Sequence, residues 1–323
     1  MYDYGLSVMP QYGLNVQNSY RGRGALICQT QDGLYMLRPF AGSVKRLERQ
    51  CRILTMLYEE HGMRVDVPVY NLEGNLVSTD EQETSYVLHR WYEGKECDTR
   101  SKEEVLRSVA SLGRLHLAMK MPGLDEGSAE PLEQEYLRHN RELRKIRKFI
   151  RSKKVSNSFE RQYLNSVEEF LEWAQEAVQC LEESSYEQLF QEVQKQGIIC
   201  HGEFNQHHVL FQGSQIAITG FDKWKYDLQV ADLYCFMRKI LEKTDWDVRL
   251  GEKMIETYNG VKTLSKQEYE HLKIRFSYPE KYWKLANYYY GHNKAWISEK
   301  NVEKLQNVLY QKKVWREFVR EMF

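Results

Sequence analysis

The stretch that decides the fold runs from Gly197 to Asp232 and reads GIICHGEFNQHHVLFQGSQIAITGFDKWKYDLQVAD. An apolar run that ends at Cys200 leads into a polar loop, which begins with His-Gly-Glu at 201–203. A second apolar run starts at Val209, and a Gly-Ser turn returns the chain to Gly-Phe-Asp at 220–222. Such β-rich runs, separated by turn residues, predict a strand, a loop and a hairpin. We expect the hairpin to bring the two polar clusters side by side.

This stretch resembles the catalytic segment of aminoglycoside phosphotransferases and choline kinases. In those families the loop reads His-Gly-Asp, four more residues and Asn, and the hairpin ends in a metal-binding Asp. The resemblance is more specific to the CotS type of spore coat protein. It rests on HGEFNQHHVLF (201–211), GFDKW (220–224), ADLYCFMRK (231–239) and FSYPEKYWKLANYYYGHNKAW (276–296). It implies a two-lobed, protein-kinase-like α+β fold, with a small β-rich lobe in residues 1–92 and a mainly helical lobe in residues 93–323.

Three catalytic positions of the resembled enzymes have changed in this chain. The resemblance places Glu203 at the catalytic Asp, His208 at the metal-binding Asn and Gly220 at the second metal-binding Asp. Mg²⁺ requires oxygen ligands in octahedral geometry, so an imidazole nitrogen is a poor substitute and glycine offers no side chain. Glu203 keeps the charge, but its extra methylene moves the carboxylate, and a ~1 Å misplacement can cost on the order of a hundredfold in rate.

Two alternatives for a working metal site remain open. On an extended strand Asp222 would face the same side as Gly220, roughly 6–7 Å further along, and would replace the missing ligand. A transition-metal site could instead use the nitrogen and oxygen ligands of His201, Glu203, His207, His208 and Asp222, although no spacing here matches a zinc motif. Otherwise we expect His201 to have a structural role in the loop.

Asp232 stands at the start of a predicted helix and is expected to cap it. In the related kinases an Asp at this place braces the catalytic loop, which is also a structural duty.

The resemblance also assigns two residues of the small lobe to nucleotide binding. In kinases a strand Lys neutralises the nucleotide phosphates and a helix carboxylate positions that Lys. Arg38 falls on the Lys position, and Glu48 falls in the partner helix, predicted over 44–59. Because the planar fork of Arg differs from a point ammonium, we expect an Arg38–Glu48 pair that holds the small lobe together. The RGRG stretch at 21–24 predicts an ordinary turn.

Composition excludes several classes of protein. Lys plus Arg equals Asp plus Glu at 46 each, so a global nucleic-acid or membrane-surface role has no support. No apolar run approaches the ~20 residues of a membrane span, and the N-terminus lacks the pattern of a signal peptide. The six cysteines form no C-x-x-C pair, which indicates a reducing compartment.

One stretch is strongly basic, RHNRELRKIRKFIRSKK at 138–154. Leu143, Ile146 and Ile150 form an apolar stripe along it, which predicts an amphipathic helix. Its basic side is either a solvated face or a docking surface for an acidic partner or polymer.

By resemblance, we predict a spore coat protein that has kept a phosphotransferase fold and lost its chemistry. It would have a structural or docking role, with other coat proteins as partners and no cofactor. It would be made in the mother cell and deposited on the forespore. The alternative is a small-molecule or sugar kinase that uses Mg-ATP with an unusual metal site. A third hypothesis is a scaffold that binds ATP without turnover.

Overall fold

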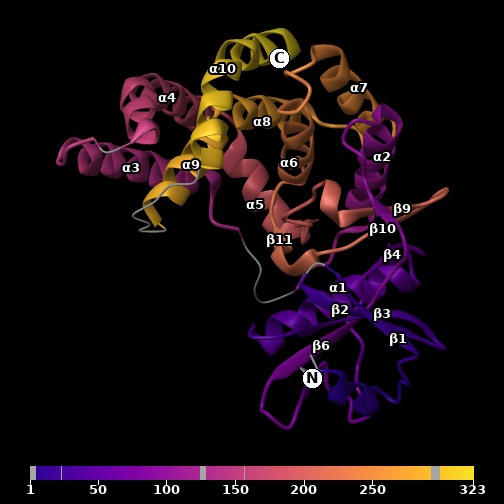
Figure 1. Ribbon diagram of the computed structural model, residues 1–323. Coiled ribbons are helices and arrows are strands. Elements are labelled where there is room, and N and C mark those ends of the chain that lie inside the picture. The colour runs from indigo at the N-terminus through magenta and orange to yellow at the C-terminus, as the bar shows by residue number, and fades with distance from the viewer. Residues whose placement is uncertain (1–4, 23, 124–128, 156, 292–298) are drawn as a thin grey trace. The chain divides into compact units, whose positions relative to one another are not determined.

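The computed structural model describes residues 5–22, 24–123, 129–155, 157–291 and 299–323. The chain forms two compact units (Figure 1). We call Met1–Gly127 together with Gln196–Tyr226 the sheet unit, and Ser128–Lys195 together with Asp227–Phe323 the helical unit. This division differs from the lobes predicted at 1–92 and 93–323, because the strand-loop-hairpin segment packs with the N-terminal sheet. The lobe boundary itself stays a prediction.

A five-stranded antiparallel sheet dominates the N-terminal part of the sheet unit. Its strands follow the order β1 (Asn18–Gly22), β2 (Ala25–Thr30), β3 (Gly33–Pro39), β6 (Ser85–Arg90) and β5 (Val77–Thr79). Helix α1 (Val44–Glu59) forms where the sequence predicts it, and β2 and β3 form an antiparallel hairpin. One face of the sheet packs against the 3₁₀ helix η1 (Leu6–Tyr12), and the buried Leu26 and Leu37 belong to this core.

Residues alternate between the two faces of a strand, so Met36 and Arg38 of β3 lie on the face opposite Leu37. Ile27, which is the register partner of Met36 on β2, is buried with it on that second face. Arg38 therefore leaves the sheet on the side away from η1.

A smaller sheet is built from strands that are distant in the sequence. Its order is β4 (Arg64–Val65), β10 (Gln215–Ile218), β9 (Val209–Gln212) and β7 (Lys95–Glu96), with β4 and β10 parallel. Figure 1 shows this join between early and late parts of the chain. The antiparallel hairpin of β9 and β10 confirms the predicted one.

Two short elements flank this hairpin, and helix α2 (Lys102–Ala118) completes the sheet unit. A two-residue strand β8 (Ile199–Cys200) pairs with β11 (Lys225–Tyr226). The 3₁₀ turns η2 (Gln206–His208) and η3 (Phe221–Lys223) hold the two polar clusters.

The helical unit is rich in aromatic packing. Its helices are α3 (Leu132–Arg151), α4 (Ser158–Glu183), α5 (Tyr186–Gln196), α6 (Val230–Leu241), α7 (Val248–Asn259), α8 (Lys266–Ser277), α9 (Glu280–Gly291) and α10 (Glu299–Met322). Tyr278 stacks on Tyr136 with ring centroids 3.6 Å apart, and Tyr282 stacks on Phe170 at 4.0 Å. The late family-specific stretch thus supplies core aromatics, although its residues 292–296 lie outside the described residues. Among the helices described, none combines the length and apolar character of a membrane span.

Candidate functional site

His201 ties the polar loop to the end of the hairpin. Its side chain is fully buried, its Nε2–H donates to the carbonyl oxygen of Thr219 at 3.0 Å, and its Nδ1 accepts the backbone N–H of Glu203 at 3.2 Å. These two bonds fix the tautomer of the ring. His201 thus has the geometry of the structural residue that the sequence predicted.

The loop at 201–203 and the η3 turn touch through their backbones. Gly202 has φ +83°, and a Cβ there would lie 1.9 Å from the carbonyl oxygen of Lys223. Such a close approach admits glycine alone. The Glu203 carboxylate is half-exposed, and its Oε2 lies 3.0 Å from Nζ of Lys223. The residue at the catalytic position is therefore engaged in a surface ion pair, a type of interaction that contributes about 0–1 kcal/mol.

The two altered metal positions face each other. Strand β10 ends at Ile218, and Gly220 adopts the left-handed conformation, with φ 81° and ψ 44°, at the start of η3. A Cβ at residue 220 would lie 2.2 Å from Nδ1 of His208 and 2.3 Å from its Cε1. The imidazole of His208 thus occupies the space in which any side chain at position 220 would begin.

Asp222 does not lie on an extended strand beside Gly220, as the substitute-ligand alternative assumed. The positive φ of Gly220 turns the chain into η3 instead. There the carboxylate of Asp222 accepts both arms of the Arg38 guanidinium: Nη1 donates to Oδ2 at 2.7 Å, and Nη2 to Oδ1. Burial alone would raise the pKa of Asp222, but the hydrogen bonds and charge of Arg38 hold it below its ordinary value.

The prediction that Arg38 pairs with Glu48 is therefore wrong. Glu48 lies exposed on α1, and Arg38 pairs with Asp222. The guanidinium fork of Arg38 meets both oxygens of the Asp222 carboxylate. Because Arg38 engages both oxygens of Asp222, a metal ion at this carboxylate would compete with the Arg38 pair.

A second arginine holds the same turn. Arg46 of α1 donates through Nη2 to the carbonyl oxygens of Asp222 at 3.2 Å and Trp224 at 2.6 Å. Its guanidinium also lies 4.9 Å from the centroid of the Trp224 ring, which is fully buried. We call Arg38 and Arg46, with their contacts to residues 222–224, the arginine clamp. No local pattern marks Arg46, because its partners lie more than 170 residues away.

A buried acid and a buried histidine lie beside the clamp, and the sequence reasoning missed both. Asp66 is 2% exposed, its Oδ2 accepts the N–H of Gly220 at 2.9 Å, and its Oδ1 has no hydrogen-bond partner among the described residues. His89 is 0% exposed, and its Nδ1 donates to the backbone carbonyl of Asp66 at 2.9 Å. The two contacts join residues that are 154 and 23 positions apart in the sequence, which no local pattern reveals.

The pKa values of Asp66 and His89 are shifted in opposite directions. Burial raises the pKa of Asp66 to about 7, and the charge of Asp222 adds to this shift, while the Gly220 hydrogen bond opposes it. Burial lowers the pKa of His89 to about 4, and the charge of Arg38 lowers it further. Because the pKa of Asp66 is raised on folding from 3.8, its contribution to stability is complete below about pH 4 and is lost as the pH rises through 7.

Asp232 also departs from the prediction. Helix α6 begins at Val230 with Gln229 at the N-cap, and the side chain of Gln229 makes no capping bond. Asp232 instead lies buried within the first turn, where its carboxylate complements the helix dipole. Among the described residues, no group of three or more His, Cys, Asp and Glu side chains is arranged to hold a metal ion, so the transition-metal alternative gains no support.

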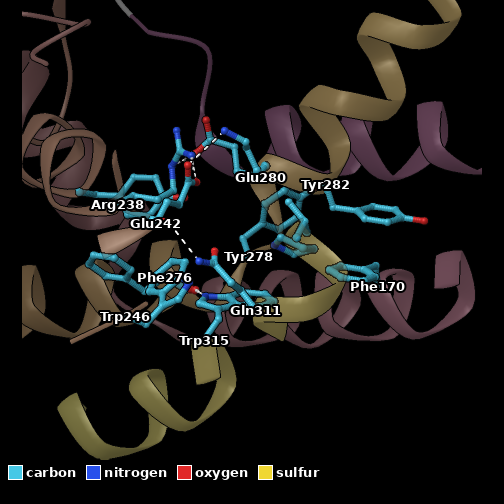
Figure 2. Close-up of a pocket in the computed structure, with 14 residues that line it drawn as sticks. Phe170, Arg238, Glu242, Trp246, Phe276, Tyr278, Glu280, Tyr282, Gln311 and Trp315 are labelled. Atoms are coloured by element: carbon cyan, nitrogen blue, oxygen red, sulfur yellow. Dashed lines mark hydrogen bonds and ion pairs between the residues drawn. The ribbon is translucent and has the colours of Figure 1, made fainter. Parts of the chain in front are cut away.

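Two hollows of the described structure are lined by residues outside this site. A groove of about 450 Å³ beside the β1–β2 turn is lined by Leu26, Leu37 and Tyr86, which lie on the sheet face opposite Arg38. The second is a cavity of about 40 Å³ in the helical unit, room for little more than water. Figure 2 shows charged Arg238 and Glu280 on one side of it and aromatic rings on the other. Neither hollow includes a residue of the candidate site.

The chain matches the family described as spore coat putative kinase YutH over residues 7–322. It belongs to this family. It is also 23% identical to Spore coat protein S of Bacillus subtilis (strain 168) over 261 residues, which cover 78% of this chain and 73% of that protein. The predicted membership of a spore coat family is confirmed.

Solved structures confirm the predicted fold. An aminoglycoside phosphotransferase from Alicyclobacillus acidocaldarius superposes with a TM-score of 0.85 at 17% identity, covering 97% of this chain and 93% of that one. A microcompartment-associated aminopropanol kinase gives a TM-score of 0.63 at 13% identity, covering 98% and 96%. This chain therefore has the α+β architecture of these small-molecule kinases.

Proposed function

We propose that this protein is a spore coat pseudokinase, which retains the phosphotransferase fold but does not transfer phosphoryl groups. One observation carries the proposal: the imidazole of His208 fills the space at Gly220, where the second metal-binding carboxylate would begin. The resembled enzymes have an oxygen ligand at each of positions 208 and 220. Here the imidazole of His208 takes the space of both ligands and offers nitrogen in place of oxygen.

The arginine clamp supports the same conclusion. Phosphoryl transfer needs a metal that bridges the phosphates and a cation that contacts them. Here Arg38, at the position of that cation, is bound to Asp222, which is the nearest substitute ligand. A nucleotide bound through these residues would have to break the two hydrogen bonds that join Arg38 to Asp222.

The family indicates where the protein acts. Its relatives are described as spore coat proteins, so we place this chain at the spore coat, made in the mother cell and bound to other coat proteins. Its role there is structural or docking.

A Mg²⁺-dependent kinase is the second candidate, because the Glu203 carboxylate is 41% exposed and accessible to a substrate hydroxyl. The test is thermal unfolding with and without ATP, each with and without Mg²⁺. A ligand at a hundredfold excess over Kd stabilises the native state by about 2.7 kcal/mol. We expect no shift in the unfolding temperature and no turnover of ATP.

The two other hypotheses give different outcomes in the same experiment. A shift without turnover would identify a nucleotide-binding scaffold. A Mg²⁺-dependent shift with turnover that Glu203→Ala abolishes, and that the matched surface variant Glu133→Ala leaves intact, would refute the pseudokinase proposal.

A further inference from the structure

Three arginines of helix α3 form ion pairs along its flanks. Arg147 and Arg151 share the carboxylate of Glu168, and Arg138 bonds to Glu130 at 2.9 Å. The buried side of the helix carries the predicted apolar stripe, which is at most 1% exposed. The flanks of α3 are thus neutralised within the helical unit.

The outermost side of α3 is different. It carries four cations that make no ion pair with any residue the structure describes: Arg141, Arg144, Lys145 and Lys148. At 100° per residue they fall within an arc of about 100°, and they span about 10 Å along the helix axis. We call them the basic face. From residue 143 to residue 154 the sequence contains no acidic residue.

The spacing within the basic face is unfavourable for the protein alone. Like charges three or four residues apart on a helix destabilise it, and Arg141–Lys145 and Arg144–Lys148 are both such pairs. A partner with negative charge would relieve this repulsion. The arrangement therefore favours a bound anionic group over a free surface.

An aromatic pair borders the basic face. Phe149 of α3 is 43% exposed and meets Tyr290 of α9, itself 44% exposed, edge to face with ring centroids 5.5 Å apart. Exposed aromatic rings next to arginines are typical of surfaces that bind proteins. A purely anionic polymer has no apolar groups that could pack on these rings.

We propose that the basic face and the Phe149–Tyr290 pair dock an acidic segment of another protein. Carboxylates of the segment would bind the four cations, and an apolar side chain would pack on the aromatic pair. This inference rests on the proposed docking role, but it does not depend on the loss of phosphoryl transfer.

The probe is a fluorescein-labelled 16-residue peptide in which Asp and Glu alternate with Leu, Tyr and Ser, measured by fluorescence anisotropy. The test variant carries Arg141→Gln, Arg144→Gln, Lys145→Gln and Lys148→Gln. The matched control carries Lys253→Gln, Lys266→Gln, Lys300→Gln and Lys304→Gln, which are exposed lysines outside α3. Circular dichroism and the unfolding temperature verify that both variants fold.

We expect the test variant to bind at least tenfold more weakly and the control to stay within twofold of the parent protein. The Phe149→Ala variant keeps all four cations of the basic face, and it should bind the peptide about threefold more weakly. Equal losses in the test variant and the control would overturn the proposal. So would polyphosphate that binds as tightly as the peptide and ignores Phe149→Ala, since that would identify an anionic polymer as the occupant. None of these readouts uses ATP, so an active kinase would leave the result unchanged.

Discussion

Gly220→Ala is the most direct probe of the altered metal site. The added methyl group meets two separate obstacles. A non-glycine residue in the left-handed region costs about 1–2 kcal/mol, and Gly220 has φ +81°. The methyl would also lie 2.2 Å from Nδ1 of His208, and overpacking of this kind costs about 1–3 kcal/mol. We expect Gly220→Ala to destabilise the protein by about 2–5 kcal/mol.

A double-mutant cycle separates the two obstacles. His208→Ala removes the ring but leaves the backbone strain, so the double variant should recover the overpacking part, about 1–3 kcal/mol. The assay is urea unfolding of the parent, both single variants and the double variant, read as free energies of unfolding. Gly213→Ala, another glycine with positive φ but with nothing within 4 Å of its Cβ, gives the strain alone. Additive single effects, with a coupling energy near zero, would refute the claim that the imidazole fills the space at position 220.

The remaining predictions concern the neighbouring groups. Gly220→Asp combined with His208→Asn should raise Mg²⁺ affinity in calorimetric titration, and more so with Arg38→Met, which frees Asp222; no gain in either variant would contradict the occupied-site explanation. Asp66→Asn should gain stability over the parent as the pH rises from 4 to 7, by at most about 4 kcal/mol, and a difference independent of pH would contradict the raised pKa. Arg46→Met should lower the free energy of unfolding by about 1–3 kcal/mol through its lost charged hydrogen bonds, whereas Arg21→Met on the exposed β1 serves as a control with little expected effect.

The loop and the hairpin of the candidate site could be predicted from short stretches of the sequence. Gly, Ser and β-rich runs predicted the loop and the hairpin, and the resemblance to phosphotransferases assigned His208 and Gly220 to one metal site. The Asp222 error also has a local cause. Two residues on an extended strand face the same side, but Gly220 uses its positive φ to end the strand and begin a 3₁₀ turn.

The partners of the arginines could not be predicted in this way. Arg38 and Asp222 are 184 residues apart, and Arg46 reaches carbonyl groups, which every residue carries. Asp66 likewise gives no signal, because its environment comes from Gly220, 154 residues later. Such contacts depend on the three-dimensional fold. Glu48 was predicted as the partner of Arg38 only because kinases have a carboxylate in the corresponding helix.

The small sheet has a consequence for synthesis on the ribosome. Strands β4 and β7 are complete by residue 96, but their partners β9 and β10 end at residue 218, 122 residues later. At 5–20 residues per second this interval lasts about 6–24 seconds. During that time the emerging chain holds unpaired strand edges, which are prone to pair with other chains. Strands β4 and β7 are each only two residues long. The nascent protein therefore exposes few unpaired backbone groups to other chains before the β9–β10 hairpin is synthesised.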